Sequence, residues 1–118
     1  MTENGHDPVA EARARVVEID AANAIMQHEH QDAVFLDVRE RNEWNLGHVP
    51  GAVHLPRAEV EADAASLLNR DGNVVVYCAG GTRAVQAAEM LKQLGYEHVS
   101  VLNGGFRGWV EGGGDVED

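Results

Sequence analysis

The segment around the single cysteine holds the residue types best suited to chemistry. An apolar run over Val74–Tyr77 ends at Cys78. A glycine-containing loop can turn successive N–H groups toward one anion, and the N-terminus of a following helix adds partial positive charge. We therefore expect Cys78 to ionise readily and act as a nucleophile, with Arg83 closing the loop from the other side. The residues between them, expected to bind substrate, are Ala79, Gly80, Gly81 and Thr82.

The alternative is that Cys78 is an inert side chain. A cysteine after a strand is often only a small buried hydrophobe, and Gly80-Gly81 could form a simple turn. Beyond Arg83, however, apolar residues recur at the spacing of a helix face, at Ala84, Ala87, Ala88 and Leu91. The combination of strand, cysteine, glycines, arginine and helix favours the reactive interpretation.

The elements that must position this loop alternate between strands and helices. Apolar runs predict strands over 16–19, 33–37, 52–55, 74–77 and 99–102. Helical spacing predicts a helix capped by Asp20 and further helices over 39–44, 60–68, 84–92 and 106–110. This alternation predicts a three-layer α/β/α fold around a five-stranded, mainly parallel sheet. Ligands of such sheets bind beyond the carboxyl ends of the strands, where Cys78 falls.

Length and composition limit the number of domains and the kinds of site that the chain can form. The chain has 118 residues and is 44% hydrophobic, which suits one globular domain. We expect a flexible N-terminus over 1–11, a folded domain over 12–110 and a flexible acidic tail over 111–118. One cysteine excludes an internal disulfide framework and a multi-cysteine zinc site.

Charge narrows the function classes further. The net charge of −11 argues against binding to nucleic acids or anionic membranes, because both need a positive surface. The segment 72–110 is different, with three cations against two anions, so we expect it to admit an anionic substrate. The sequence shows neither a secretory signal nor an apolar run of membrane-spanning length, which predicts a cytoplasmic protein.

Four blocks in sequence order carry a resemblance to a known family. Cys-x-x-Gly-x-Arg after an apolar strand is similar to the active-site loop of the single-domain rhodanese-like sulfurtransferases. Asp37–Glu40 with Glu43-Trp44 resembles the first block of that family, Gly47–Leu55 its signature segment and Leu102–Trp109 its closing block. The resemblance covers about residues 16–110 and implies the rhodanese-like α/β fold.

The resemblance also implies a reaction. A thiolate at Cys78 would take a sulfane sulfur from a donor such as thiosulfate or a related persulfide. A nucleophilic acceptor (cyanide, a thiol or a sulfur-carrier protein) would then remove it. The reaction implies no metal and no organic cofactor. A second hypothesis is a sulfur-relay or interaction module that uses a partner protein and turns over small molecules poorly.

Differences from the family pattern bear on the substrate. Thiosulfate-specialised members often carry a basic residue where this chain has Ala79, and many members have Ser where it has Ala84. These differences weaken thiosulfate as the cellular donor without affecting the nucleophile. Related phosphatases and arsenate reductases place five residues between Cys and Arg. Here only four separate Cys78 from Arg83, which makes a smaller bowl that suits a sulfur atom better than a phosphoryl group.

Other conspicuous side chains are expected to be structural. The family resemblance implies that Asp37 and Arg39 stabilise the fold as an ion pair. His48 is expected to form hydrogen bonds rather than act as a base. His28 and His30 lie about 200° apart on a helix and should not chelate a metal. Packing in the core or at its edge is expected for Trp44, Phe106 and Trp109, and a solvated surface charge for Arg107.

Overall fold

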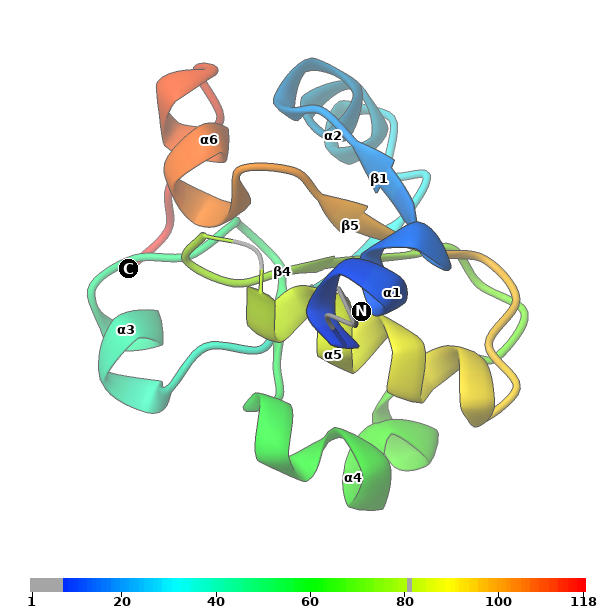
Figure 1. Cartoon of the computed structure of the whole chain (residues 1–118). Coiled ribbons are helices and arrows are strands. Elements are labelled where there is room, and N and C mark those ends of the chain that lie inside the picture. The colour runs from blue at the N-terminus through cyan, green and yellow to red at the C-terminus, as the bar shows by residue number, and fades with distance from the viewer. Residues whose placement is uncertain (1–7, 81) are drawn as a thin grey trace.

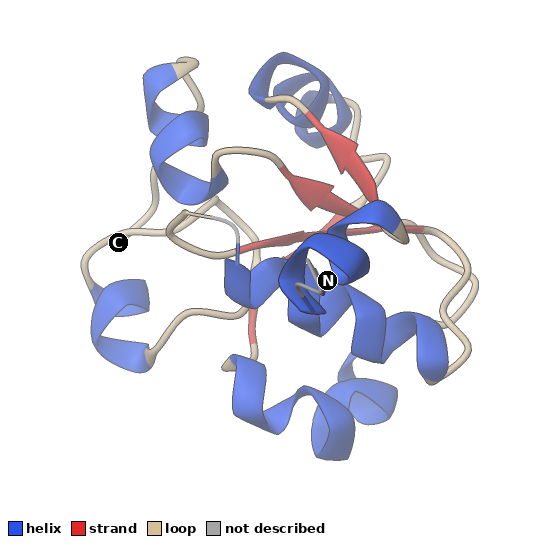
Figure 2. Ribbon diagram, in the orientation of Figure 1, coloured by secondary structure: helices blue, strands red, loops and turns tan. Residues whose placement is uncertain are grey.

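A five-stranded parallel sheet forms the centre of the molecule in the computed structural model, which describes residues 8–80 and 82–118 (Figures 1 and 2). Its spatial order is β1-β5-β4-β2-β3, and every neighbouring pair is parallel. The strands are β1 (Val17–Ile19), β2 (Val34–Asp37), β3 (Val53–His54), β4 (Val74–Tyr77) and β5 (Val99–Leu102). The α/β fold with a five-stranded, mainly parallel sheet is thereby confirmed.

Helices follow most of the strands and connect them. They are α1 (Pro8–Ala14), α2 (Ala21–Glu29), α3 (Arg41–Asn45), α4 (Val60–Leu67), α5 (Thr82–Gln93) and α6 (Gly105–Glu111), with a 3₁₀ turn, η1 (Arg57–Glu59). Local sequence explains their ends: Asp20 caps α2 by accepting the Asn23 N–H, and Gly95, at φ +101°, follows the end of α5. No helix among the described residues is long and apolar enough to cross a membrane.

Alternating side chains of the strands feed two apolar cores, one on each face of the sheet. On β4, Val74 and Val76 point to the core beneath α1, α4 and α5, whereas Val75 and Tyr77 point to the core beneath α2 and α6. Figure 1 shows α2 and α6 on one face and α4 and α5 on the other. All four side chains of β4 are buried, as the central position of the strand requires. The end of β4 is therefore a rigid place from which to present a reactive group.

The N-terminal boundary differs from the prediction. Residues 8–11, expected to be flexible, belong to α1, which begins at Pro8, a residue favoured in the first turn of a helix. Ala12 is buried against the core, and Arg15 ties this segment to Glu89 of α5 at 2.6 Å. Tertiary packing therefore stabilises a seven-residue helix that would be marginal in isolation. The expected flexibility of residues 1–7 lies outside the described residues.

The acidic C-terminal tail folds back onto the domain, and its flexibility stays a prediction. A turn through Gly113, at φ +95°, lets the chain fold back after α6. The Trp109 indole N–H donates to the Asp115 carbonyl at 2.6 Å, and Glu117 forms an isolated antiparallel bridge with His48. We call residues 112–118 the C-terminal strap. Most residues of the strap are exposed to solvent, yet these contacts dock its backbone on the domain.

Candidate active site

Cys78 lies at the carboxyl end of β4, directly before the loop that leads into α5 (Figure 1). Its side chain is 1% exposed, and the Ala84 N–H donates to its Sγ at 3.4 Å. Ala84 belongs to the first turn of α5, so the positive end of that helix faces the sulfur. Between them, Ala79, Gly80 and Thr82 are exposed, while the predicted loop residue Gly81 lies outside the described residues. The geometry provides a buried sulfur beside a backbone donor at the start of a helix.

The start of α6 fixes the backbone of Cys78 from the other side. The Phe106 N–H donates to the Cys78 carbonyl at 2.7 Å. Gly105, at φ +60°, packs so closely that a Cβ there would come within 2.4 Å of the Cys78 carbonyl oxygen and 2.5 Å of the Ala79 carbonyl oxygen. Only glycine allows this approach without displacing the loop. Two segments distant in sequence therefore hold the cysteine in place.

Arg83 is paired with a carboxylate of another helix. Its guanidinium bonds Glu43 of α3, with N–O distances of 2.7 and 3.1 Å, and its role in closing the loop over the sulfur stays a prediction. Hydrogen bonds from Arg83 lower the pKa of Glu43 from 4.5 to about 2. Hydrogen bonding to Glu43 in turn raises the pKa of Arg83, with a smaller contribution from Cys78. The pair remains charged and ties α3 to the first turn of the helix behind the cysteine.

Asp37 and Arg39 form the buried ion pair that the sequence predicts. Arg39 bonds Asp37 through its Nε and Nη2, with the shortest contact at 2.7 Å, and its side chain is 6% exposed. Burial opposes the charge of Arg39, but the hydrogen bonds and charge of Asp37 outweigh it and raise the pKa of the arginine. The guanidinium also lies 4.5 Å from the centre of the Phe106 ring and donates to the Gly47 carbonyl. It thereby connects the signature segment to α6.

Aromatic and histidine side chains pack in the walls around the loop. Trp44 stacks on His48, with ring centres 3.4 Å apart, and also on His54. His48 forms the hydrogen bonds expected of it, and Trp109 is buried against Phe35. The described residues contain no group of three or more His, Cys, Asp or Glu side chains placed to hold a metal.

Two contributors to this region were missed from the sequence. Glu43 was noted only as part of a motif, and Glu117 only as one charge in the tail. Each lies far along the chain from its partner, with Glu43 separated from Arg83 by 40 residues. A charged residue carries no local signal of so distant a contact. The predicted helix over 39–44 and the packing role of Trp44 indicated that α3 would be ordered, but not that Glu43 would contact Arg83.

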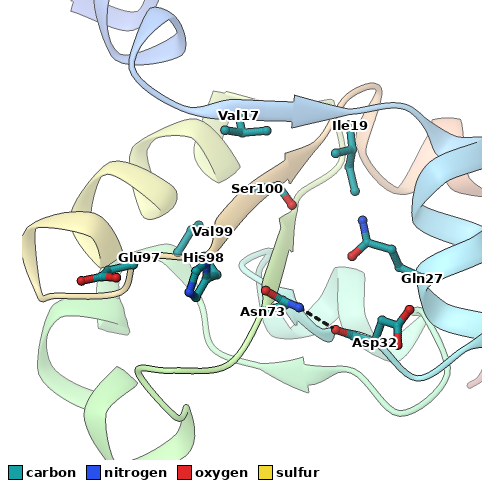
Figure 3. Close-up of a pocket in the computed structure, with 9 residues that line it drawn as sticks. All are labelled: Val17, Ile19, Gln27, Asp32, Asn73, Glu97, His98, Val99 and Ser100. Carbon is teal, nitrogen blue, oxygen red and sulfur yellow. Dashed lines mark hydrogen bonds between the residues drawn. The ribbon is translucent and has the colours of Figure 1, made fainter.

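A depression of about 530 Å³ lies at the opposite, amino-terminal end of the sheet. Figure 3 shows the Gln27 and Asn73 carboxamides and the Ser100 hydroxyl around it, with Asn73 donating to the Asp32 carbonyl at 3.1 Å. Its other lining residues include His98, Glu97 and the edge-strand residues Val17 and Ile19. Nothing in this lining resembles the buried sulfur and backbone donors at Cys78, so the chemistry is assigned to the carboxyl end.

Comparison with known proteins agrees with this geometry. Residues 19–112 match the model of the Rhodanese-like domain. The chain belongs to the rhodanese-like domain family. A sulfurtransferase from Allochromatium vinosum is 35% identical over 83 residues, covering 70% of this chain and 77% of that protein. Several other curated relatives are longer, and this chain spans 40 to 57% of their length.

Solved structures show the same family and fold. The rhodanese-like domain of an Anabaena protein, determined by NMR, has a TM-score of 0.79 at 35% identity, covering 85% of this chain and 77% of that one. A Rhodopseudomonas palustris protein described as a possible tyrosine phosphatase has a TM-score of 0.83 at 27% identity, covering 99% of both chains. The family therefore includes sulfurtransferase relatives, and the neighbouring structures carry more than one functional description.

Proposed function

We propose that this protein transfers sulfane sulfur through a persulfide on Cys78. With thiosulfate as donor, the Cys78 thiolate attacks the outer sulfur, the donor S–S bond breaks, and sulfite leaves with the bonding electron pair. An acceptor thiolate, a sulfur-carrier protein or cyanide then attacks the outer sulfur of the persulfide and regenerates the Cys78 thiolate. Each step exchanges one S–S bond or converts it to a C–S bond, so no external oxidant or reductant is required.

The observation that carries the proposal is the donation of the Ala84 N–H to the Cys78 Sγ, at 3.4 Å, at the start of α5. This backbone donor, at the N-terminus of a helix, lies where it can bond negative charge on the sulfur during reaction. The same groups can stabilise the charge of a persulfide as it forms, because preset donors need no rearrangement during reaction. Burial of the sulfur at 1% exposure limits the approach of water.

Positioning is the proposed role of the pair between Arg83 and Glu43. Because Glu43 offsets much of the arginine charge, Arg83 attracts an anionic donor less strongly than an unpaired guanidinium would. What the pair supplies is a fixed start to α5 and therefore a fixed Ala84 N–H. With only one cysteine in the sequence, no internal disulfide can release the sulfur, so an external acceptor must take it.

Intact-mass spectrometry tests the proposal directly. The protein is incubated with thiosulfate, glutathione persulfide or cysteine persulfide, and its mass is measured before and after addition of cyanide. We expect a gain of one sulfur atom that cyanide removes, and no gain in Cys78→Ser. If none of these donors adds sulfur to the folded wild-type protein, the proposal is wrong.

A sulfur-relay module is the second candidate, and the residue beside the cysteine favours it. Ala79 is exposed and uncharged, so the loop offers a small dianion no basic side chain at that position. In Ala79→Arg, a large rise in thiosulfate turnover would support a different natural donor. An unchanged rate would count against the relay. Rapid transfer to a carrier protein together with slow transfer to cyanide would also favour the relay.

Phosphatase activity is the least favoured alternative despite the description of one structural neighbour. Four residues separate Cys78 from Arg83, which makes a smaller loop than one with five, and the Arg83 guanidinium is paired with Glu43. Both features favour a sulfur atom over a phosphoryl group. We expect no hydrolysis of para-nitrophenyl phosphate under conditions in which Cys78 accepts sulfur.

A further inference from the structure

His48 lies where the signature segment, α3 and the C-terminal strap meet. Its side chain is 8% exposed, and its ring stacks on Trp44 with ring centres 3.4 Å apart and an interplanar angle of 3°. Its Nδ1 lies 3.1 Å from the Trp44 carbonyl oxygen. Its Nε2 lies 3.2 Å from Oε1 of Glu117 in the strap. Both ring nitrogens are therefore committed to named partners.

The two partners of the ring can only accept hydrogen bonds. A backbone carbonyl has no proton to donate, and Oε1 of Glu117 also accepts the Gly51 N–H at 3.1 Å, as an ionised carboxylate does. A neutral imidazole carries one N–H and can satisfy only one of these contacts, whereas an imidazolium satisfies both. A cation stacked on the Trp44 ring gains further attraction. The geometry thus matches the protonated histidine.

The same residues hold the strap through their backbones. The His48 N–H donates to the Glu117 carbonyl and the Glu117 N–H donates to the His48 carbonyl, both at 2.9 Å. Next to this bridge, the strap residue Val116 packs on Gly47, where an added Cβ would lie 2.9 Å from Val116 Cγ1. The side-chain contact therefore closes a junction that is already paired through the main chain.

The charged and titratable groups around His48 come from several elements. Asp37 and Arg39 neutralise each other beside it, and the Tyr77 hydroxyl accepts the N–H of the next residue, Val49. Burial raises the pKa of Tyr77, so its hydroxyl stays neutral. His54 stacks on Trp44 and lies 2.8 Å from the Arg39 carbonyl. In the strap, Asp118 reaches the neighbourhood of Gly47, while Glu117 bonds the ring itself.

This junction connects to the candidate active site through a short series of contacts. The Gly47 carbonyl accepts from Arg39 at 2.7 Å, and Arg39 lies 4.5 Å from the centre of the Phe106 ring. The Phe106 N–H in turn donates to the Cys78 carbonyl at 2.7 Å. Movement of Gly47 therefore alters the support of the residue that fixes the cysteine backbone.

We propose that His48 and Glu117 are positioning residues that latch the C-terminal strap against the wall of the Cys78 site in the imidazolium form of His48. The contact between the ring and Glu117 is strongest when both ring nitrogens carry a proton, and it weakens when the ring is neutral. The effect on Cys78 rests on the proposed function, but the latch does not, because its contacts can be measured without sulfur chemistry.

Amide hydrogen exchange followed by NMR tests the latch in the full chain. The readout is the protection factor of the Glu117 N–H, which removes the intrinsic pH dependence of exchange. We expect protection to fall about fivefold from pH 5.5 to pH 8.5, the upper end for a partly exposed ion pair. Glu117→Gln keeps the shape of the side chain and removes its charge. It should lower protection at pH 5.5 and abolish most of the pH dependence.

Asp118→Asn is the matched control, because it removes one negative charge from the adjacent residue and leaves the contact to His48 in place. It should retain the wild-type profile. Equal wild-type protection at both pH values would overturn the latch, as would a wild-type profile in Glu117→Gln or a flat one in Asp118→Asn.

Alkylation of Cys78 by iodoacetamide gives a second readout that requires no sulfur donor. The ratio of the Glu117→Gln rate to the wild-type rate at the same pH cancels the ionisation of the thiol itself. We expect a ratio above one at pH 5.5 that approaches one at pH 8.5. A ratio of one at both values would disprove the coupling to Cys78, even if sulfur transfer proves correct. Normal latching without any sulfur uptake would refute the proposed function alone.

Discussion

The amino end and the carboxyl end of the central sheet are lined by different chemical groups. At the amino end, a depression of about 530 Å³ is lined by flexible polar side chains such as Gln27, Asn73 and Glu97. At the carboxyl end, the Ala84 N–H at the start of α5 donates to the buried Cys78 sulfur, and the Phe106 N–H of α6 donates to the Cys78 carbonyl. The amino end is an open depression, whereas the carboxyl end places a backbone donor beside a nucleophile.

This difference shows that the presence of a depression does not by itself identify the reactive site in this fold. In a parallel sheet, the strands deliver their carboxyl ends and the following helices their N-termini to the same edge. Cys78 therefore meets a helix dipole and backbone N–H groups that Ser100, in the middle of β5, does not meet. Matched substitutions at the two ends of the sheet test whether sulfur transfer depends on the carboxyl end alone.

Replacement of the nucleophile should have the largest effect. Cys78→Ser should lower sulfur transfer by at least about a thousandfold, because a hydroxyl cannot carry the sulfur. The measurement is turnover with thiosulfate and cyanide, with the folded state checked by circular dichroism. Retention of a tenth of the wild-type rate would show that the reaction does not pass through Cys78.

Substitution of the glycine beside the cysteine should chiefly affect stability. Gly105→Ala places a Cβ within 2.4 Å of the Cys78 carbonyl oxygen at φ +60°. We expect the free energy of unfolding to fall by about 3 kcal/mol or more. Gly72→Ala, before β4 at the amino end, meets only ordinary contacts at 3.5 Å and should change it by less than about 1 kcal/mol. Similar losses of unfolding free energy in Gly105→Ala and Gly72→Ala, measured by urea denaturation, would contradict this prediction.

A smaller, pH-dependent effect is expected from the pair between Glu43 and Arg83. Because the folded-state pKa of Glu43 is lowered to about 2 from 4.5, its stabilising contribution is complete above pH 4.5 and is lost as pH falls toward 2. Glu43→Gln should cost about 1 kcal/mol of unfolding free energy at pH 7. The difference from wild type should shrink below pH 4.5 in denaturant titrations.

Sulfur transfer provides the second measurement on that pair. Glu43→Gln should reduce turnover at pH 7, because Arg83 and the start of α5 lose an anchor. The matched control is Glu89→Gln. Glu89 lies on α5, as Arg83 does, and its exposed ion pair is with Arg15, which follows α1. The control should transfer sulfur at the wild-type rate. An equal loss in both variants would indicate a general effect on α5 rather than a role for Glu43.

The smallest effect is expected at the amino end. Ser100→Ala removes the hydroxyl in the depression and should leave sulfur transfer unchanged, with a change in unfolding free energy within about 0.5 kcal/mol. Steady-state kinetics with two acceptors, cyanide and glutathione, would test this. A several-fold change in KM for either acceptor would mean that the depression participates in binding.

Local sequence was informative wherever a single segment determines its own structure. The continuous apolar run of β4 must be buried on both faces, so its position and bounds match the prediction, as do those of β5. The helix after the loop was also predicted from its apolar face, although it begins at Thr82 rather than Ala84. In each case hydrophobic periodicity, a property of neighbouring residues, decides the outcome.

Contacts between distant segments could not be derived in this way. The count of charges along the sequence predicted that segment 72–110 would carry less negative charge than the rest of the chain. In the structure, Glu43, from outside this segment, bonds Arg83 within it. The acidic strap likewise lies beside Gly47. Net charge is additive along a sequence, whereas the local field depends on which charges folding brings together.

The sequence by itself determined that the chain would form a parallel α/β sheet and that its single thiol would follow a buried strand. Those features depend on local periodicity and on the order of elements. Only the tertiary structure decided that Arg83 pairs with Glu43, that residues 8–14 form a helix, and that His48 holds the C-terminal strap. Such contacts arise from long-range packing between segments that are distant in sequence, which local periodicity does not encode.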